Sequence, residues 1–426
     1  MAVAPLRRTP TASRVRAAAL GLSLALLAAL VAGCGGTASG GRPTADATDA
    51  GIRQALDRRA AAVLHHDRAA FLAGIDPRAT RFLDRQKAMF TDIADVPLAD
   101  WSYRLVRTGA FGLPPTADGT VRAAAEVQLR YRLSGFDAAP VAATDYLTLS
   151  RRGGSWYVAG DDDGAASGHR GAVQLWDQGR VTVVRGTDSL VLGLGDAAGL
   201  RGYAEDVDRA VPQVRRTWGG AGWSGTVVVE VPRTLDQMAA LAAADPADYR
   251  NIAAVTTGEG GGSARVGSDR VIINPEAFSG LSAFGRQTVL THETTHVATR
   301  AWTTARTPLW LSEGAADWTA YRTAGRTARE LAPELAAAVA AGRVPAALPA
   351  DADFHSADAD TLSRAYEGGW LACRLIADQW SPDALVAFYR AVASGGTVDS
   401  HLRTTLGTTL PAFTARWRAY LHQELP

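Results

Sequence analysis

Apolar residues recur at helical spacing near the start of the chain and alternate with polar residues after it. From residue 51 to about residue 94 the spacing is typical of helices that bury one face, at Ile52, Leu56, Val63, Leu64, Phe71, Leu72, Phe82 and Leu83. Period-two alternation follows in the ranges 101–108, 121–133, 143–150 and 155–159, the last after a Gly153-Gly154 turn, and predicts strands. Helices followed by an antiparallel sheet predict an α+β module over residues 51–165.

The pattern from about Gly171 onward predicts a second α+β domain, over residues 171–426. Strands are expected at 180–184, 189–194 and 226–231, with a helix at 203–218 between the last two. Farther on, an alanine-rich helix is expected at 331–342, with Pro333 near its start. The range 382–424 reads as helices whose core positions are Leu385, Phe388, Tyr389, Phe413, Trp417 and Tyr420.

The most informative stretch of the chain is His292-Glu293-Thr294-Thr295-His296. A β-branched strand is predicted at 270–274, and Ser282 offers the N-cap of a helix that carries the motif. Residues four apart share a helix face, so both imidazoles can bind one metal ion while Glu293 reaches a water on it. The preceding strand could pair with an extended substrate along its edge. The alternative is a buried helix with two structural histidines.

A catalytic zinc site needs a third protein ligand, and a second helix downstream offers one. Pro308 suits the start of that helix, and Glu313 and Asp317 are four residues apart on it. We expect Glu313 to be the third ligand and Asp317 to accept a hydrogen bond from the free ring nitrogen of a zinc-bound histidine. The alternative is a solvated acidic pair on an exposed helix.

The two motifs together resemble the gluzincins, which are metallopeptidases with an H-E-x-x-H helix and a glutamate ligand on the next helix. The stretch Pro308-Leu309-Trp310-Leu311-Ser312-Glu313-Gly314-Ala315-Ala316-Asp317 is similar to the P-x-W-L-x-E-G-x-A sequence of the peptidase-MA-like branch. The resemblance covers roughly residues 203–380. It implies a zincin-like fold, one catalytic zinc ion bound by His292, His296 and Glu313, and Glu293 as the catalytic base. It also implies that Tyr366, at the beginning of a post-ligand helix, could stabilise the oxyanion; the alternative is a packed helix-start residue.

The resemblance implies hydrolysis of peptide bonds, with a peptide or protein as substrate. Zinc lowers the pKa of its bound water to about 7, and Glu293 would move the proton from that water to the leaving amine. The sequence lacks the G-x-M-E-N element with which the aminopeptidase branch anchors a free amine. The nearest segment, residues 258–265, offers Glu259, which we interpret as a loop charge. An endopeptidase is therefore the better expectation.

The N-terminus indicates where the chain acts. Four arginines up to Arg16 precede an apolar run at 17–32, which is short for a membrane span. The sequence Val31-Ala32-Gly33-Cys34 resembles a bacterial lipobox, which implies a lipoprotein signal peptide at 1–33 and lipid on Cys34. Residues 34–50 would be a flexible tether, and the chain would lie outside the cytoplasm, anchored to the cell membrane. The alternative is an ordinary secretory signal with an incidental cysteine.

The cysteine content and the charge distribution argue against a disulfide and against nucleic-acid binding. If Cys34 is acylated, Cys373 has no partner, so no disulfide is expected; its apolar helical surroundings suggest a buried small hydrophobe. The net charge is +1 and the basic residues are dispersed, which gives no nucleic-acid footprint. The oligomeric state is not encoded in any pattern of the sequence.

The first module resembles the NTF2-like (cone-shaped α+β) fold in the order of its elements and in its ending, Arg152-Gly153-Gly154-Ser155-Trp156-Tyr157-Val158. No constellation in it indicates a ligand. His65-His66 is expected to be solvated, and the run at 161–163 is either a calcium site or, as we favour, a solvated linker. Two alternatives to a peptidase stay open. One is a catalytically silent zinc-binding or envelope-interaction lipoprotein, and the other is a protein whose N-terminal module carries the main function.

Overall fold

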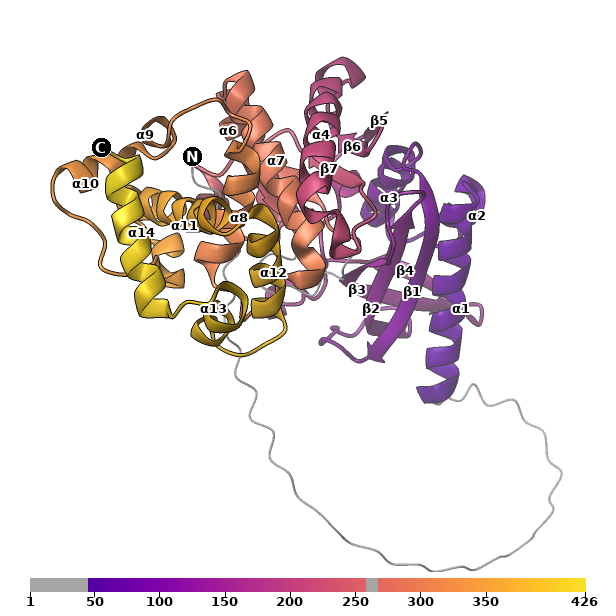
Figure 1. Ribbon diagram of the computed structural model, residues 1–426. Coiled ribbons are helices and arrows are strands. Elements are labelled where there is room, and N and C mark those ends of the chain that lie inside the picture. Colours follow the sequence, from indigo (N-terminus) through magenta and orange to yellow (C-terminus); the bar gives the residue numbers. More distant parts are fainter. Residues whose placement is uncertain (1–44, 258–266) are drawn as a thin grey trace, which may run out of the picture.

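The computed structural model describes residues 45–257 and 267–426 (Figure 1). Within them the fold is mixed α+β with two sheets, as the sequence predicted. The expected signal peptide, the lipidation site Cys34 and the loop residue Glu259 lie outside the described residues. Among the described residues, no helix combines the length and apolar character needed to cross a membrane.

The first half of the chain forms three helices and an antiparallel sheet of order β1-β2-β3-β4. The elements are α1 (Ala45–Leu64), α2 (Arg68–Ala73), α3 (Thr80–Asp92), β1 (Leu98–Thr108), β2 (Arg122–Leu133), β3 (Val141–Arg152) and β4 (Ser155–Gly160). The predicted helices and strands are all present. One detail differs: α1 begins at Ala45, inside the expected tether. It ends before His65-His66, whose side chains are exposed, as predicted.

The second sheet has the order β5-β6-β7-β9-β8, with parallel pairing from β6 through β7 to β9. Its strands are β5 (Thr182–Arg185), β6 (Ser189–Gly193), β7 (Val227–Val231), β8 (Ala254–Thr256) and β9 (Val271–Ile273). From the sequence we expect the strand before the motif helix to offer a free edge to a substrate. This expectation is wrong, because that strand, β9, pairs with β7 on one side and with β8 on the other. The outer position belongs to β8, whose residues are themselves buried.

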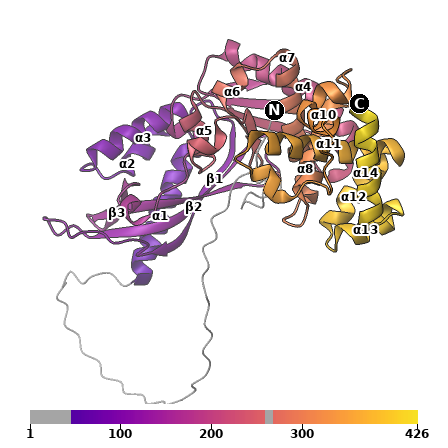
Figure 2. The same ribbon diagram turned by 90° about the vertical axis from the view of Figure 1, so that its left-hand side faces the viewer.

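Helices make up the remainder of the second half (Figure 2). They are α4 (Ala197–Trp218), α5 (Leu235–Leu241), α6 (Pro275–Ser279), α7 (Ala283–Thr299), α8 (Leu309–Tyr321), α9 (Ala328–Leu331), α10 (Pro333–Ala340), α11 (Ala359–Gln379), α12 (Pro382–Ala393), α13 (Val398–Leu406) and α14 (Leu410–Glu424). The six core positions expected from the range 382–424 are all buried. In Figure 2 these C-terminal helices lie on the side of the second sheet away from the first sheet.

One hydrophobic cluster spans the two halves of the chain. A single apolar cluster joins residues of α1, α3 and the first sheet, such as Ile52 and Trp101, to Leu190, Leu192 and Val228 of the second sheet. Arg270, next to β9, forms a buried bidentate ion pair with Asp137 from the β2–β3 turn, at 2.7 and 2.8 Å. An apolar cluster and a buried ion pair therefore cross the boundary expected near residues 165–171.

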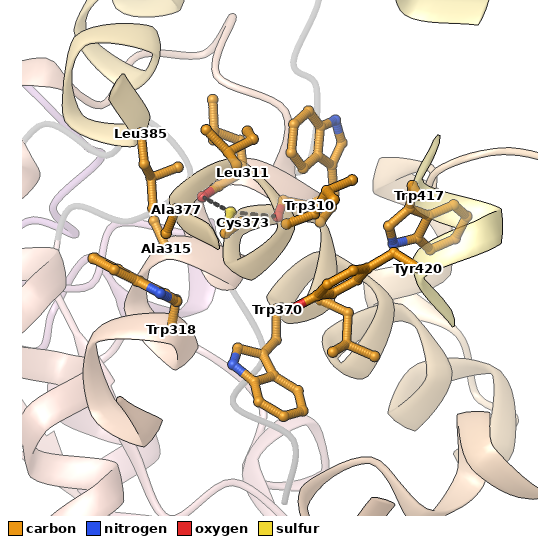
Figure 3. Close-up of a cluster of buried hydrophobic side chains, with 14 of the residues drawn as sticks. Trp310, Leu311, Ala315, Trp318, Trp370, Cys373, Ala377, Leu385, Trp417 and Tyr420 are labelled. Carbon is orange, nitrogen blue, oxygen red and sulfur yellow. Dashed lines mark hydrogen bonds between the residues drawn. The ribbon is translucent and has the colours of Figure 1, made fainter. Parts of the chain in front are cut away.

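A second cluster holds α8 against α11 (Figure 3). The thiol Sγ of Cys373 lies 3.7 Å from the carbonyl oxygen of Leu311 and 3.9 Å from that of Trp310, fully buried between the two helices. The expectation that Cys373 is buried in apolar surroundings is confirmed. A methyl group added to Gly314 would lie 2.2 Å from the carbonyl oxygen of Gly369, so the backbones of α8 and α11 touch at this point.

Candidate metal centre

Helix α7 presents the two motif histidines on one buried face. It begins where the sequence predicted, because the Ser282 side chain accepts a hydrogen bond from the Gly285 N–H and caps the first turn. One helical turn apart, the Nε2 atoms of His292 and His296 lie 2.9 Å from each other. His292 is only 1% exposed and His296 only 5%, so both imidazoles face the interior.

Glu313 reaches the same point from α8, which packs across α7. Its Oε2 lies 3.4 Å from Nε2 of His292 and 3.6 Å from Nε2 of His296. Ligand atoms placed tetrahedrally about 2.0–2.1 Å from a zinc ion are about 3.3–3.4 Å apart. The three donor atoms form a triangle of nearly this size, and they can hold one metal ion together.

Asp317 fixes the orientation of His292. Its Oδ1 lies 2.7 Å from Nδ1 of that imidazole. A carboxylate accepts only, so Nδ1 carries the proton and Nε2 keeps its lone pair for the metal. Burial acts to lower the pKa of His292, but the charge and hydrogen bond of Asp317, followed by those of Glu313, raise it. The sequence placed Asp317 correctly against a motif histidine.

Glu313 is held in its charged form. Burial acts to raise the pKa of this carboxyl group, but the charge of His296 and the contacts with both imidazoles lower the pKa to about 2. Oε2 of Glu313 has no hydrogen-bond partner in the described part of the chain. A buried carboxylate oxygen that faces two imidazole nitrogens is suited to a cation between them.

Glu293 lies beside the triangle and is not part of it. Its Oε2 accepts a hydrogen bond of 2.7 Å from the hydroxyl of Thr256 at the end of β8. Its Oε1 is buried and has no hydrogen-bond partner among the residues described. Burial raises the pKa of Glu293, and the charges of His292 and His296 oppose this. One oxygen is therefore anchored and the other is left for a proton.

Thr256 is the site residue that sequence reasoning missed. It belongs to a three-residue strand about forty positions before the motif, and nothing in its neighbours marks it. The pairing of β8 with β9 brings it over α7. Only the order of strands in the sheet, which local patterns do not contain, could have indicated its role.

Tyr366 is not at the start of a helix, so this part of the expectation is wrong. Helix α11 begins at Ala359 with Asp358 as its N-cap, and Tyr366 lies about two turns farther along the helix. The ring packs edge-on against Phe354, with 5.0 Å between centroids, and lines a cavity of about 140 Å³ together with Asp317. Its role in stabilising an oxyanion stays a prediction.

Comparisons with known protein families and with curated proteins find no match for this chain. The arrangement of the described side chains is therefore what bears on function.

Proposed function

We propose that the chain is a zinc-dependent metallopeptidase of the gluzincin type. The observation that supports the proposal is the triangle formed by His292, His296 and Glu313. Beside it lies the carboxylate of Glu293, of which one oxygen is hydrogen-bonded to Thr256. Two imidazoles and one carboxylate are a ligand set of catalytic zinc sites, where the fourth position belongs to water or substrate. A structural zinc site does not need an adjacent carboxylate with an unused oxygen.

Zinc is the metal that suits the donors best. Imidazole nitrogen and carboxylate oxygen at near-tetrahedral spacing favour zinc over calcium or magnesium, which take six or more oxygen ligands. When bound, zinc would polarise the scissile carbonyl and make water acidic enough to react near neutral pH.

Side chains of the protein transfer the proton and hold the reacting groups in place. Glu293 accepts a proton at Oε1 from the water whose oxygen forms the new bond to the carbonyl carbon. The same proton goes to the amide nitrogen as the carbon–nitrogen bond breaks, so the carboxylate is regenerated. Thr256 holds the other oxygen of Glu293, and Asp317 holds the ring of His292, so neither side chain has to reorient.

The substrate class that we propose is a peptide or protein outside the cytoplasm, cut within its chain. The amine-anchoring sequence of aminopeptidases is missing upstream of the motif. The two α+β halves would then be an NTF2-like module and a zincin-like peptidase domain, tethered to the membrane by lipid on Cys34.

One observation favours a catalytically silent zinc-binding protein as a second candidate. His292, His296, Glu313 and Glu293 are all at most 5% exposed. A site so deeply buried can hold a metal ion without admitting a peptide. The two candidates make opposite statements about turnover, and one experiment separates them.

The test is metal content and peptidase activity of the full-length protein, purified in detergent without chelator or added metal. We expect nearly one zinc ion per chain, and cleavage of an internally quenched peptide library. His296→Ala should lose both, whereas Glu293→Gln should keep the zinc and lose at least about 100-fold in turnover. His65→Ala, at an exposed histidine in the other half, is the matched control.

Two results would contradict the proposal. Folded protein that binds no zinc, even after zinc is added, would remove the metal site. Stoichiometric zinc without cleavage of any library peptide would favour the silent zinc-binding protein.

A further inference from the structure

A cavity of about 340 Å³ lies inside the first half of the chain, far from the metal ligands in sequence. Helices α1 and α3 and strands β1 and β3 form its walls, and the segment from Arg170 to Asp177 closes one side. Its volume falls at the lower end of the range for small-molecule sites, about 300–1,000 Å³. The proposed peptidase mechanism makes no use of it.

Asp145 occupies an interior position of β3. Residues of the same parity on this strand, namely Ala143, Leu147 and Leu149, are buried apolar side chains of the core. The carboxylate of Asp145 lines the cavity and, within the described ranges, forms neither a hydrogen bond nor an ion pair. Burial, followed by the nearby charge of Asp177, raises the pKa of Asp145 to about 7. A carboxylate here costs stability that an apolar residue would not.

Arg59 brings the opposite charge to the same cavity from α1. It is 7% exposed and lies on the helix face that carries Ile52, Leu56 and Val63. Its guanidinium donates to Oε1 of Gln86 and, over 3.3 Å, to the hydroxyl of Tyr103. No carboxylate of the described residues lies within ion-pair distance, although buried arginines normally have one.

The remaining lining of the cavity combines aromatic rings with further charged side chains, namely Asp161, Asp162, Asp177 and Arg170. Trp101 and Trp176 are fully buried, with 5.6 Å between ring centroids, and Phe82, Tyr103 and Tyr146 are the other aromatic residues of the lining. Aromatic faces attract ammonium and guanidinium groups and also bury apolar side chains. A ligand that is only an anion would be repelled by Asp145 and the other carboxylates of the lining, and a ligand that is only a cation would leave the buried Arg59 without a counter-charge. A ligand that carries both charges can satisfy both residues.

We propose that this cavity binds a small zwitterion, a free amino acid or a short peptide. The ligand ammonium group lies against Asp145 and its carboxylate against Arg59, while the aromatic rings cover its side chain. The site is independent of the metal centre and would exist even if the chain had no peptidase activity.

The test begins with a screen of the full-length protein in detergent. The probes are the twenty free L-amino acids and the glycyl dipeptides, each at up to about 10 mM, the range of weak sites. The first readout is the unfolding temperature, which rises when a probe binds the folded state. The best probe is then titrated by calorimetry beside its amide, which lacks the carboxylate, and its N-acetyl form, which lacks the ammonium group.

We expect each derivative to bind at least about tenfold more weakly than the parent probe, a difference of 1.4 kcal/mol. Asp145→Asn, which keeps the shape of the side chain, should lose at least as much, and Asp84→Asn on the exposed side of α3 should lose nothing. The unfolding temperature of Asp145→Asn verifies that the variant folds. A water-filled polar cavity that no probe occupies, or unchanged affinity in Asp145→Asn, would overturn the proposal. Binding of the amide as tight as the parent would show a site for cations only.

Discussion

Asp317 acts on the metal site through a single imidazole. Replacing it with alanine removes the acceptor at Nδ1 of His292, so the ring can rotate and its Nε2 becomes less basic. We expect Asp317→Ala to weaken zinc binding by about 10–100-fold while the protein stays folded. Competition with a chelating dye measures the affinity. Asp360→Ala, at an exposed aspartate early in α11, should leave it unchanged, and equal affinities for both variants would exclude this role for Asp317.

The sequence predicts a residue of the metal site when another residue of the site lies one turn away on the same helix. His292 and His296 are one turn apart, and Glu313 and Asp317 are spaced the same way on α8. Thr256 could not be predicted, since only its strand's position over α7 brings it to Glu293. Asp145 lies in a predicted strand, yet alternation alone does not reveal that its interior face borders a cavity.

At the scale of elements, the contact between α8 and α11 positions the glutamate ligand. Gly314 follows Glu313 directly, and a side chain there would meet the backbone of Gly369. We expect Gly314→Ala to push the helices apart, with a loss of about 1–3 kcal/mol in unfolding free energy and weaker zinc binding as Glu313 moves. Denaturant unfolding and the dye competition measure the two effects.

Gly202 in α4 provides the matched control for that substitution. A methyl group there meets no atom within 4 Å, so Gly202→Ala should raise the unfolding free energy by about 0.4–1 kcal/mol through the unfolded chain. A stable Gly314→Ala with normal zinc affinity would show that the close approach of the two helices is not needed.

Periodicity predicted most elements but not their neighbours. Helical and alternating patterns are local, so they predict α7, α8 and the strands of both sheets except β8. The order of strands in a sheet depends on residues far apart in the sequence, so local patterns do not predict it. For this reason β9 is expected at the edge of the sheet, whereas β8 occupies that edge. The start of α11 differs from the expectation for another reason: the family pattern places it at Tyr366, whereas the side chain of Asp358 caps the helix before Ala359.

At the scale of the whole molecule, the sequence suggested two domains and the structure joins them. The apolar cluster that links α1 and the first sheet to β6 and β7 belongs to both halves, whereas a second large cluster lies within the second half alone. Cutting the chain near residue 168 would expose part of this cluster on both fragments. The fragments are then expected to aggregate, so single substitutions in the intact chain are the better way to assign function to either half.

The buried pair of Arg270 and Asp137 gives a direct test of this coupling. Asp137→Ala leaves a guanidinium buried without its bidentate partner, and we expect a loss of about 3–5 kcal/mol in unfolding free energy. Because an apolar cluster is shared by both halves, calorimetry should show one transition that moves to lower temperature as a whole. Asp95→Ala breaks an exposed ion pair with Arg180 that also joins the halves, and it should cost at most about 1 kcal/mol. Two separate transitions, with only one shifted by Asp137→Ala, would mean that the halves unfold independently and that the peptidase half is stable without the cavity-bearing half.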